Sequence, residues 1–462
     1  MPASISQEMP ICHSTFQELY DKLVQLFHTN EGRKDLEYCG VSIYSLFEST
    51  LKATLVCQGD SEIDLTELLS KAKALTDYCD EAILLYHFKE VPDHWRRMLM
   101  DSGLLNVMIQ LKGLISIRTA SEAPTDFEKL EPKVQSMMSE LDICLVVSGA
   151  PGPDRRSTAL LVLDELQAWL TAGRRRVKER QEAPSAKRLK VDVGERQKTE
   201  KEEGAAGRLK YPIERLTEAP SFEWFLAHCN QEIPTPFILP KGCGIIDEWP
   251  AFKHHPWKST EYLLSVAADR VVPVEIGSQY TDADWSQKMM RFSDFVQEHI
   301  VKQEKDGPPA YLAQHDVFYQ IPRLERDIII PDYCYIEAEL NDSYVQRTPQ
   351  QEVLKNAWFG PKGTVSPLHQ DPYHNLLCQV VGSKYLKLIS HQQTPLVYPR
   401  EGLMTNTSQI DVEHPDVEKF PAYKEVHYLE CILQEGEVLY IPPKWWHFVK
   451  SLETSFSVSL WF

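Results

Sequence analysis

The sequence predicts an α+β protein, with an all-α N-terminal domain and a strand-rich C-terminal domain. Apolar residues recur at helical spacing over residues 1–171. Residues 172–210 are crowded with charge and poor in apolar side chains, a composition that cannot sustain a core, so we expect a disordered basic linker there. Over residues 211–462, short apolar runs alternate with turn signals, as in strands.

Composition limits the classes of function. The formal net charge of the 462 residues is -18, so we expect no direct binding to nucleic acid. The ten cysteines are scattered without a C-x-x-C pair, which argues against a disulfide framework and a structural zinc site. No signal peptide is recognisable, and no apolar run approaches the roughly 20 residues of a membrane span. We therefore expect an intracellular protein without membrane contact.

The N-terminal domain begins with a run of apolar residues at helical spacing, namely Phe16, Leu19, Tyr20, Leu23 and Phe27. Further helices are expected in residues 64–88, 94–115, 125–147 and 158–170. No cluster of catalytic groups stands out there. Packing of the helices on each other explains the pattern, while partner binding or autoinhibition by this domain stays open.

The linker carries two basic clusters, Arg174-Arg175-Arg176 and Lys187-Arg188-Leu189-Lys190. Their separation resembles a bipartite nuclear import signal, and the second cluster resembles a monopartite one. We expect an import receptor as a partner and a nuclear location, with the cytoplasm as a second location. The alternative is a solvated charge run without a receptor.

A candidate metal centre comes from the H-x-D motif of His369 and Asp371. Two residues apart on an extended strand, these side chains point to the same face. A lone H-x-D occurs by chance in many proteins, but a third ligand from a distant residue such as His447 would complete the set. Two histidines and one carboxylate leave coordination positions open, which suits Fe(II) oxygen chemistry.

Gly382-Ser383 predicts a two-residue hairpin turn that pairs Val381 with Lys384. Parity then places a set of residues on one face of the hairpin: Asn375, Leu377, Gln379, Lys384, Leu386 and Leu388. If that face is the interior, the ammonium of Lys384 needs an anion. No acidic residue lies between Asp371 and Glu401, so the carboxylate of a cosubstrate is a candidate. The alternative is a surface lysine on an edge strand.

From about residue 223 to the last, the chain resembles the jumonji-C (JmjC) 2-oxoglutarate oxygenases. The segments that carry the resemblance are VVPVEIGSQYTDADW, YLAQHDVF, NAWFGPKGTVSPLHQDPYHN, NTSQIDVEHPDVEKFP and SFSVSLWF. The resemblance implies a double-stranded β-helix (cupin-like) domain that uses Fe(II), 2-oxoglutarate and O₂. It implies iron ligation by His369, Asp371 and His447, and a set of residues around 2-oxoglutarate: Tyr311, Ser366, Asn375, Lys384 and Trp461.

The substrate candidates lie on and after the strand VVPVEIG. Glu275 sits among apolar residues, with Tyr280 and Trp285 close behind, and a carboxylate with aromatic faces can hold a guanidinium or a methylammonium. A buried structural salt bridge is the alternative for Glu275. Trp358, just before the metal motif, either walls the substrate cleft or packs in the core.

The resemblance implies a protein or peptide substrate. We favour hydroxylation of arginine side chains in nuclear, chromatin-associated or other proteins. Demethylation of histone methyl-lysine is the alternative, because the metal site is the same for both reactions. A noncatalytic chromatin scaffold and a peptidase have less support, since every expected ligand is present and no nucleophile motif is recognisable.

Overall fold

The computed structural model describes residues 11–28, 33–56, 62–87, 90–119, 127–182, 209–277, 281, 285–302, 308–336 and 353–462. The chain divides into two compact units. The first comprises Met1–Ala183 with Ala267–Val271, and the second comprises Pro184–Val266 with Val272–Phe462. The short segment at 267–271 therefore groups with the first unit, whereas the sequence predicted one unbroken domain from residue 211.

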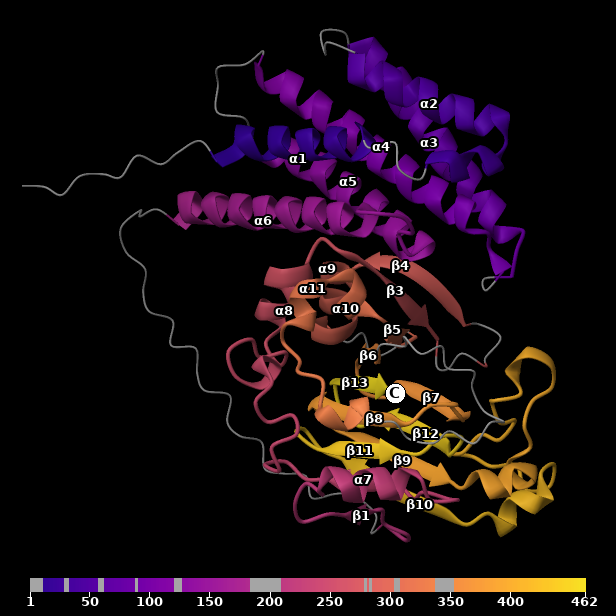
Figure 1. Cartoon of the computed structure of the whole chain (residues 1–462). Coiled ribbons are helices and arrows are strands. Elements are labelled where there is room, and N and C mark those ends of the chain that lie inside the picture. The colour runs from indigo at the N-terminus through magenta and orange to yellow at the C-terminus, as the bar shows by residue number, and fades with distance from the viewer. Residues whose placement is uncertain are drawn as a thin grey trace, which may run out of the picture. The chain divides into compact units, whose positions relative to one another are not determined.

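The first unit is helical, as predicted (Figure 1). Its elements are α1 (Ile11–His28), η1 (Arg33–Cys39), α2 (Val41–Val56), α3 (Glu62–Leu84), α4 (Asp93–Thr119), α5 (Phe127–Ser148) and α6 (Arg155–Glu182). Helix α4 packs against α1, α3 and α5, and its Leu104, Leu105 and Met108 are fully buried. By length and composition alone α4 could cross a membrane, although the sequence analysis found no apolar run of that length. However, 78% of its most apolar window is buried inside the protein, as in a core helix.

Helix α6 corrects the predicted start of the linker, because it continues through residues 172–182. Arginine, lysine, glutamate and alanine are good helix formers, and Arg175 pairs with Glu179 one turn later at 2.8 Å. Arg174 is held by Glu131 at 2.6 Å. The first basic cluster therefore lies on a helix rather than in a flexible segment. The second cluster, Lys187-Arg188-Leu189-Lys190, lies outside the described residues.

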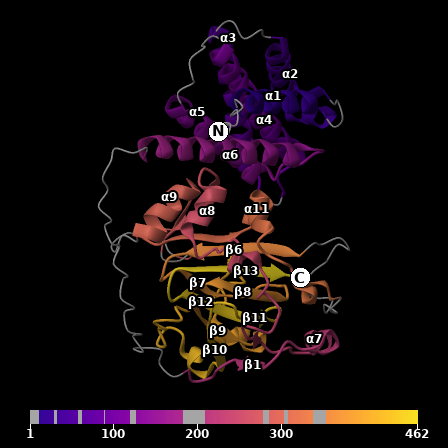
Figure 2. The same cartoon turned by 90° about the vertical axis from the view of Figure 1, so that its left-hand side faces the viewer.

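The second unit contains two sheets (Figure 2). The larger has the order β1-β2-β11-β8-β13-β6-β5-β3-β4 and the smaller the order β10-β9-β12-β7. The strands of the larger sheet are β1 (Glu214–Arg215), β2 (Phe237–Leu239), β3 (Val271–Ile276), β4 (Ser286–Arg291), β5 (Ala310–His315), β6 (Leu354–Gly360), β8 (Asn375–Val381), β11 (Val438–Ile441) and β13 (Ser455–Trp461). Those of the smaller sheet are β7 (Val365–His369), β9 (Lys384–Ile389), β10 (Tyr428–Leu433) and β12 (Trp446–Ser451).

Short helices complete the second unit. They are α7 (Phe222–Cys229), η3 (Pro250–Phe252), α8 (Thr260–Ala267), α9 (Phe292–Phe295), η4 (Val296–Lys302), α10 (Val317–Gln320), α11 (Pro322–Glu325), η5 (Asp332–Tyr335), η6 (His391–Val397), η7 (Gly402–Met404) and η8 (Pro421–Glu425). In α7, the Ser221 hydroxyl accepts from the Trp224 backbone N–H and caps the helix. Helices η6, η7 and η8 lie in the long connection between β9 and β10.

The predicted hairpin at Gly382-Ser383 is wrong. Strand β8 pairs with β11 and β13, whereas β9 pairs with β10 and β12. The turn therefore carries the chain from one sheet to the other. Gly382 adopts a φ of +71°, and a Cβ there would meet the Thr454 carbonyl oxygen at 2.2 Å, so only glycine fits this crossing. The inner faces of the two sheets oppose each other. The residues that were predicted to share one face of the hairpin therefore still point into the same interior, although they lie on different sheets.

Candidate metal centre

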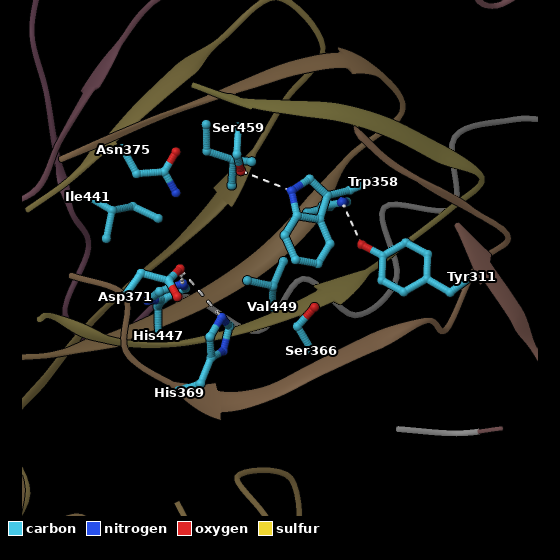
Figure 3. Close-up of a pocket in the computed structure, with 12 residues that line it drawn as sticks. Tyr311, Trp358, Ser366, His369, Asp371, Asn375, Ile441, His447, Val449 and Ser459 are labelled. Atoms are coloured by element: carbon cyan, nitrogen blue, oxygen red, sulfur yellow. Dashed lines mark hydrogen bonds and ion pairs between the residues drawn. The ribbon is translucent and has the colours of Figure 1, made fainter. Parts of the chain in front are cut away.

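Three potential metal ligands converge at one end of the smaller sheet (Figure 3). Strands β7 and β12 are antiparallel neighbours, and their register places His447 directly opposite His369. Asp371 follows β7 by two residues, and its Oδ2 lies 3.8 Å from Nε2 of His369 and 3.6 Å from Nε2 of His447. All three donor atoms lie within 4.8 Å of one another. A single ion at their centre would touch all three.

A β-bulge in β7 brings a further residue to the same side. Opposite β12, His369 pairs with His447 but Ser366 pairs with Val449, so two residues of β7 oppose one of β12. In a regular strand, residues three apart point to opposite faces, yet Ser366 and His369 both line the same pocket. Pro367 sits inside the bulge, where its missing N–H costs no ladder hydrogen bond. The bulge thus adds a hydroxyl beside the histidines.

Backbone contacts orient both imidazoles. Nδ1 of His369 lies 2.7 Å from the Pro367 carbonyl oxygen, and Nδ1 of His447 lies 2.9 Å from that of Trp445. When each Nδ1–H donates to its carbonyl, each Nε2 presents a lone pair towards Asp371. Burial, reinforced by the neighbouring His369, lowers the pKa of His447 to about 3, so this ligand is neutral at physiological pH. Burial raises the pKa of Asp371, and His369 partly offsets this.

A strained backbone position holds the carboxylate ligand. Lys444 adopts a φ of +61°, which is uncommon for a residue with a side chain. Its backbone N–H donates to the Asp371 carbonyl oxygen at 2.7 Å. The same turn delivers Trp445 and Trp446 and then His447. Two of the three candidate ligands therefore depend on one turn.

A buried cation lies in the same pocket. Lys384 is 1% exposed, and its Nζ donates to the Tyr311 hydroxyl at 3.1 Å. Burial raises the pKa of the Tyr311 phenol, and a hydrogen bond with Ser366 partly offsets this rise. Burial lowers the pKa of Lys384 to about 7, and within the described part of the chain no carboxylate pairs with it. Of the two positions that the sequence left open for Lys384, the structure shows the buried one, and the surface alternative is wrong.

The pocket suits a small anion that also reaches the metal ligands. It is lined by residues from both sheets: Tyr311, Trp358, Ser366, His369, Asp371, Asn375, Leu377, Lys384, Ile441, His447, Val449 and Ser459. Asn375 Oδ1 is buried without a hydrogen-bond partner among the described residues. An anionic group of a ligand would satisfy the ammonium of Lys384, and a donor such as an ordered water beside that ligand would satisfy Asn375 Oδ1. These residues therefore fit a bound metal together with a carboxylate cosubstrate.

The remaining predicted residues lie around this pocket or outside it. Trp358 lines the pocket, and its Nε1 donates to Ser459 at 3.0 Å (Figure 3). Trp461 does not line it; it stacks on Tyr373 with ring centroids 5.2 Å apart, and its buried Nε1 has no partner among the described residues.

The substrate candidates lie one strand further out. Glu275 is opposite Tyr311 in the pairing of β3 with β5. Burial raises the pKa of Glu275, and the neighbouring Trp285, whose buried Nε1 makes no hydrogen bond to the described residues, partly offsets this. Among the described residues no ion pair reaches Glu275, so the salt-bridge alternative finds no support. Neither residue is among those that line the pocket, and Tyr280 lies outside the described residues.

Sequence reasoning missed several supporting positions. Pro367 lies in the bulge of β7, Lys444 in the turn before β12, and Gly360 at the end of β6 beside Tyr311. The prolines near His369 and Lys444 and the glycine itself were the available signals. The backbone of residues 406–408 adds to the free edge of β7, because Ser408 N–H donates to the Leu368 carbonyl at 2.8 Å. That contact joins segments forty residues apart, and nothing local predicts it.

Comparison with known proteins identifies the family. Residues 231–462 match the model of the cupin-like domain. Lysine-specific demethylase 8 of Danio rerio is 38% identical over 414 residues, which cover 87% of this chain and 89% of that protein. The chain belongs to the cupin-like JmjC family.

Two further JmjC relatives match over about half of each chain. Lysine-specific demethylase 8 of Xenopus tropicalis is 48% identical over 244 residues, 52% of this chain and 51% of that protein. Jumonji C domain-containing protein 5 of Drosophila melanogaster is 44% identical over 261 residues, 54% of this chain and 62% of that protein. JmjC proteins normally use Fe(II) and 2-oxoglutarate, and the α+β fold class with a cupin-like C-terminal domain is confirmed.

Proposed function

We propose that this JmjC protein is an Fe(II)- and 2-oxoglutarate-dependent oxygenase that hydroxylates arginine side chains of proteins. One observation carries the oxygenase part: the buried Lys384–Tyr311 pair and the cluster of His369, Asp371 and His447 line one pocket. Membership of the JmjC family supports the same cosubstrate.

The chain supplies the metal ligands and their orientation. His369 and His447 would bind the metal through Nε2, because their Nδ1 atoms face backbone carbonyls, and Asp371 would bind it through its carboxylate. Iron bound there with 2-oxoglutarate and O₂ would supply insertion of one oxygen atom into a substrate C–H bond, coupled to oxidation of 2-oxoglutarate to succinate and CO₂. Burial of the ligands keeps water away from that chemistry.

The opposite end of the pocket would bind the cosubstrate. Lys384, with the hydroxyls of Tyr311 and Ser366, would hold the carboxylate distant from the metal. Asn375 Oδ1, which lacks a partner among the described residues, would accept from an ordered water at the ligand, because 2-oxoglutarate itself has no donor hydrogen. Trp358, fixed by Ser459, would wall the side of the pocket nearest Tyr311. In this proposal these residues would position the cosubstrate and exclude water.

The assignment to arginine rests on the surroundings of Glu275. A partly buried carboxylate beside Trp285 would pair with a guanidinium and stack against it. Removal of a methyl group from lysine is the second candidate, and the names of the relatives favour it at least as well, since several are called lysine-specific demethylases. Hydroxylation of an N-methyl carbon leads to loss of formaldehyde, so the two candidates share the whole metal centre.

The location and partners of the enzyme are also part of the proposal. The cluster Lys187-Arg188-Leu189-Lys190 would bind an import receptor and carry the protein to nuclear substrates, including chromatin proteins. Arg174 contributes less than the sequence predicted, because it is engaged with Glu131 on a helix. A reporter fused to residues 183–208 that stays cytoplasmic would refute import through this segment.

Mass spectrometry of treated peptides tests the function. Arginine-containing and methyl-lysine-containing nuclear peptides are incubated with the protein, Fe(II), 2-oxoglutarate and O₂, with His369→Ala as the control. One added oxygen on arginine is the expected product. Loss of a methylene from methyl-lysine would instead establish the second candidate. No binding of 2-oxoglutarate to the metal-loaded protein would overturn both and favour a noncatalytic scaffold.

A further inference from the structure

Gly360 on β6 lies directly opposite Tyr311 on the neighbouring strand β5. The register of β5 with β6 pairs Leu312 with Phe359, so the next antiparallel pair is Tyr311 with Gly360. A Cβ at Gly360 would lie 2.7 Å from Cδ2 of Tyr311 and 3.0 Å from Cγ2 of Thr364. The first distance is shorter than side chains tolerate. The Tyr311 ring therefore occupies the space that any side chain at position 360 would need.

The backbone at Gly360 does not itself require glycine. Its φ lies outside the left-handed range, unlike Gly363 at +92° and Gly382 at +71°. Glycine within a strand weakens it unless another group uses the vacant space, and an aromatic ring across the strand pair can cover that space. At Gly360 the useful property is thus the missing side chain, and the group that uses it is Tyr311.

The position of the ring matters because its far end reaches the buried lysine. Tyr311 accepts from Lys384 Nζ at 3.1 Å and hydrogen-bonds with Ser366. Trp358, two residues before Gly360 and on the same face of β6, lies 6.0 Å away between ring centroids. Trp358 is fixed in turn by its hydrogen bond to Ser459. A side chain at position 360 would push the Tyr311 ring away from β6. The ring could then not keep both its place beside Trp358 and its contact with Lys384.

We propose that Gly360 is a positioning residue for the anion-binding pair Tyr311 and Lys384: its bare Cα seats the tyrosine ring so that the hydroxyl reaches the ammonium. This inference rests on the proposed function insofar as the anion is 2-oxoglutarate. Gly360 touches no ligand and acts only through Tyr311. The substitution Gly360→Ala therefore weakens 2-oxoglutarate binding without removing any group that contacts 2-oxoglutarate.

Binding to the full-length protein, loaded with Mn(II) and kept free of oxygen, tests this by calorimetry. Gly360→Ala is expected to raise the Kd for 2-oxoglutarate about ten-fold or more, the effect of losing one hydrogen bond to a charged group. Tyr311→Ala raises the Kd similarly and opens room for a methyl group at position 360. The double variant Gly360→Ala/Tyr311→Ala then binds no more weakly than Tyr311→Ala. Equal weakening by Gly360→Ala in both backgrounds would overturn the inference.

Folding is controlled in the same series. If Gly360→Ala lowers the thermal midpoint mainly through the clash with Tyr311, it lowers the midpoint less in the Tyr311→Ala background than in the wild-type background; an equal decrease in both backgrounds contradicts a clash with Tyr311. Gly113→Ala in α4 is the matched control. A Cβ there meets only Leu65 Cδ1, at an ordinary 3.7 Å, so the Kd is expected to stay unchanged.

A second readout does not depend on 2-oxoglutarate. In a crystal structure of Gly360→Ala, the distance from Tyr311 Oη to Lys384 Nζ is expected to exceed hydrogen-bond range. An unchanged contact would overturn the inference even if the wild-type protein bound 2-oxoglutarate. Conversely, wild-type protein that does not bind 2-oxoglutarate, combined with a displaced Tyr311 in the variant, would refute the proposed function and leave the positioning role intact.

Discussion

Replacing Lys384 by methionine separates its binding role from any structural role, because the two predict opposite changes in stability. Methionine keeps the length and the apolar stem of lysine but removes the charge. Lys384 is 1% exposed, and its described polar partner is the neutral Tyr311 hydroxyl. In the absence of an anion, the ammonium is therefore a cost to the folded state rather than a gain.

The pKa gives the size of that cost. Burial lowers the pKa of Lys384 from 10.5 to about 7. The difference corresponds to roughly 4–5 kcal/mol against the charged form in the folded protein. The unfolded chain binds more protons than the folded one between pH 7 and 10.5, so stability without ligand rises with pH across this window. Lys384→Met should abolish this part of the pH dependence and raise the thermal midpoint at pH 7 by several degrees.

Binding of 2-oxoglutarate should change in the other direction. Removing one partner of a buried charge pair costs about 3–5 kcal/mol. The Kd for 2-oxoglutarate is therefore expected to rise by on the order of 10²–10³-fold. Binding of Mn(II) is expected to persist, because His369, Asp371 and His447 are unchanged. Calorimetry with Mn(II)-loaded protein and thermal unfolding of the ligand-free protein measure the two effects.

Lys387 on the same strand provides the control. It is three residues from Lys384 and so on the opposite face of β9, where its Nζ lies 4.5 Å from the ring centre of Tyr428. Lys387→Met should leave the Kd unchanged. If Lys384→Met instead destabilised the ligand-free protein and left the Kd unchanged, Lys384 would be a structural lysine and the proposed cosubstrate site would be wrong.

Three further changes test separate parts of the molecule. His369→Ala should abolish Mn(II) binding in metal analysis while the far-ultraviolet circular dichroism stays native; retained stoichiometric metal would contradict the proposed centre. Glu275→Gln should spare decarboxylation of 2-oxoglutarate without substrate but lower substrate modification, measured by succinate release and mass spectrometry, and equal loss of both would contradict its substrate role. Asp101→Ala breaks the fully buried pair with Arg155 in the helical unit and should cost about 3–5 kcal/mol of stability in denaturant unfolding, with an unchanged Kd for 2-oxoglutarate.

The sequence predicted the elements of the fold better than their partners. The helices of the first unit follow from apolar spacing, since each buries one face within the unit. The end of α6 was missed, because residues 172–182 combine good helix formers with too little apolar surface to reveal a helix by pattern. Ion pairs from Arg174 and Arg175 supply the missing support, and only the structure identifies their partners.

The predicted hairpin placed the Lys384 side chain on the correct face of its strand but paired that strand with the wrong neighbour. Alternation along each strand is local, so it correctly placed Asn375, Leu377 and Lys384 on the pocket side. Whether β8 and β9 pair with each other depends on which distant strands compete for their edges. Strands β11 and β13 take both edges of β8, while β10 and β12 take both edges of β9. The glycine that suggested a hairpin serves a crossing between sheets instead.

The bulge at Pro367 marks the limit of reasoning from alternation. Applied to β7, the rule places Ser366 and His369 on opposite faces, and it would have excluded one of them from the pocket. The extra residue in β7 reverses the parity between them while it keeps His369 opposite His447. Leu368, which belongs to the bulge and directly precedes the histidine, then packs into a core cluster with Ile389 and Trp446. One inserted residue thus lets a five-residue strand contribute a metal ligand, a hydroxyl and a core side chain.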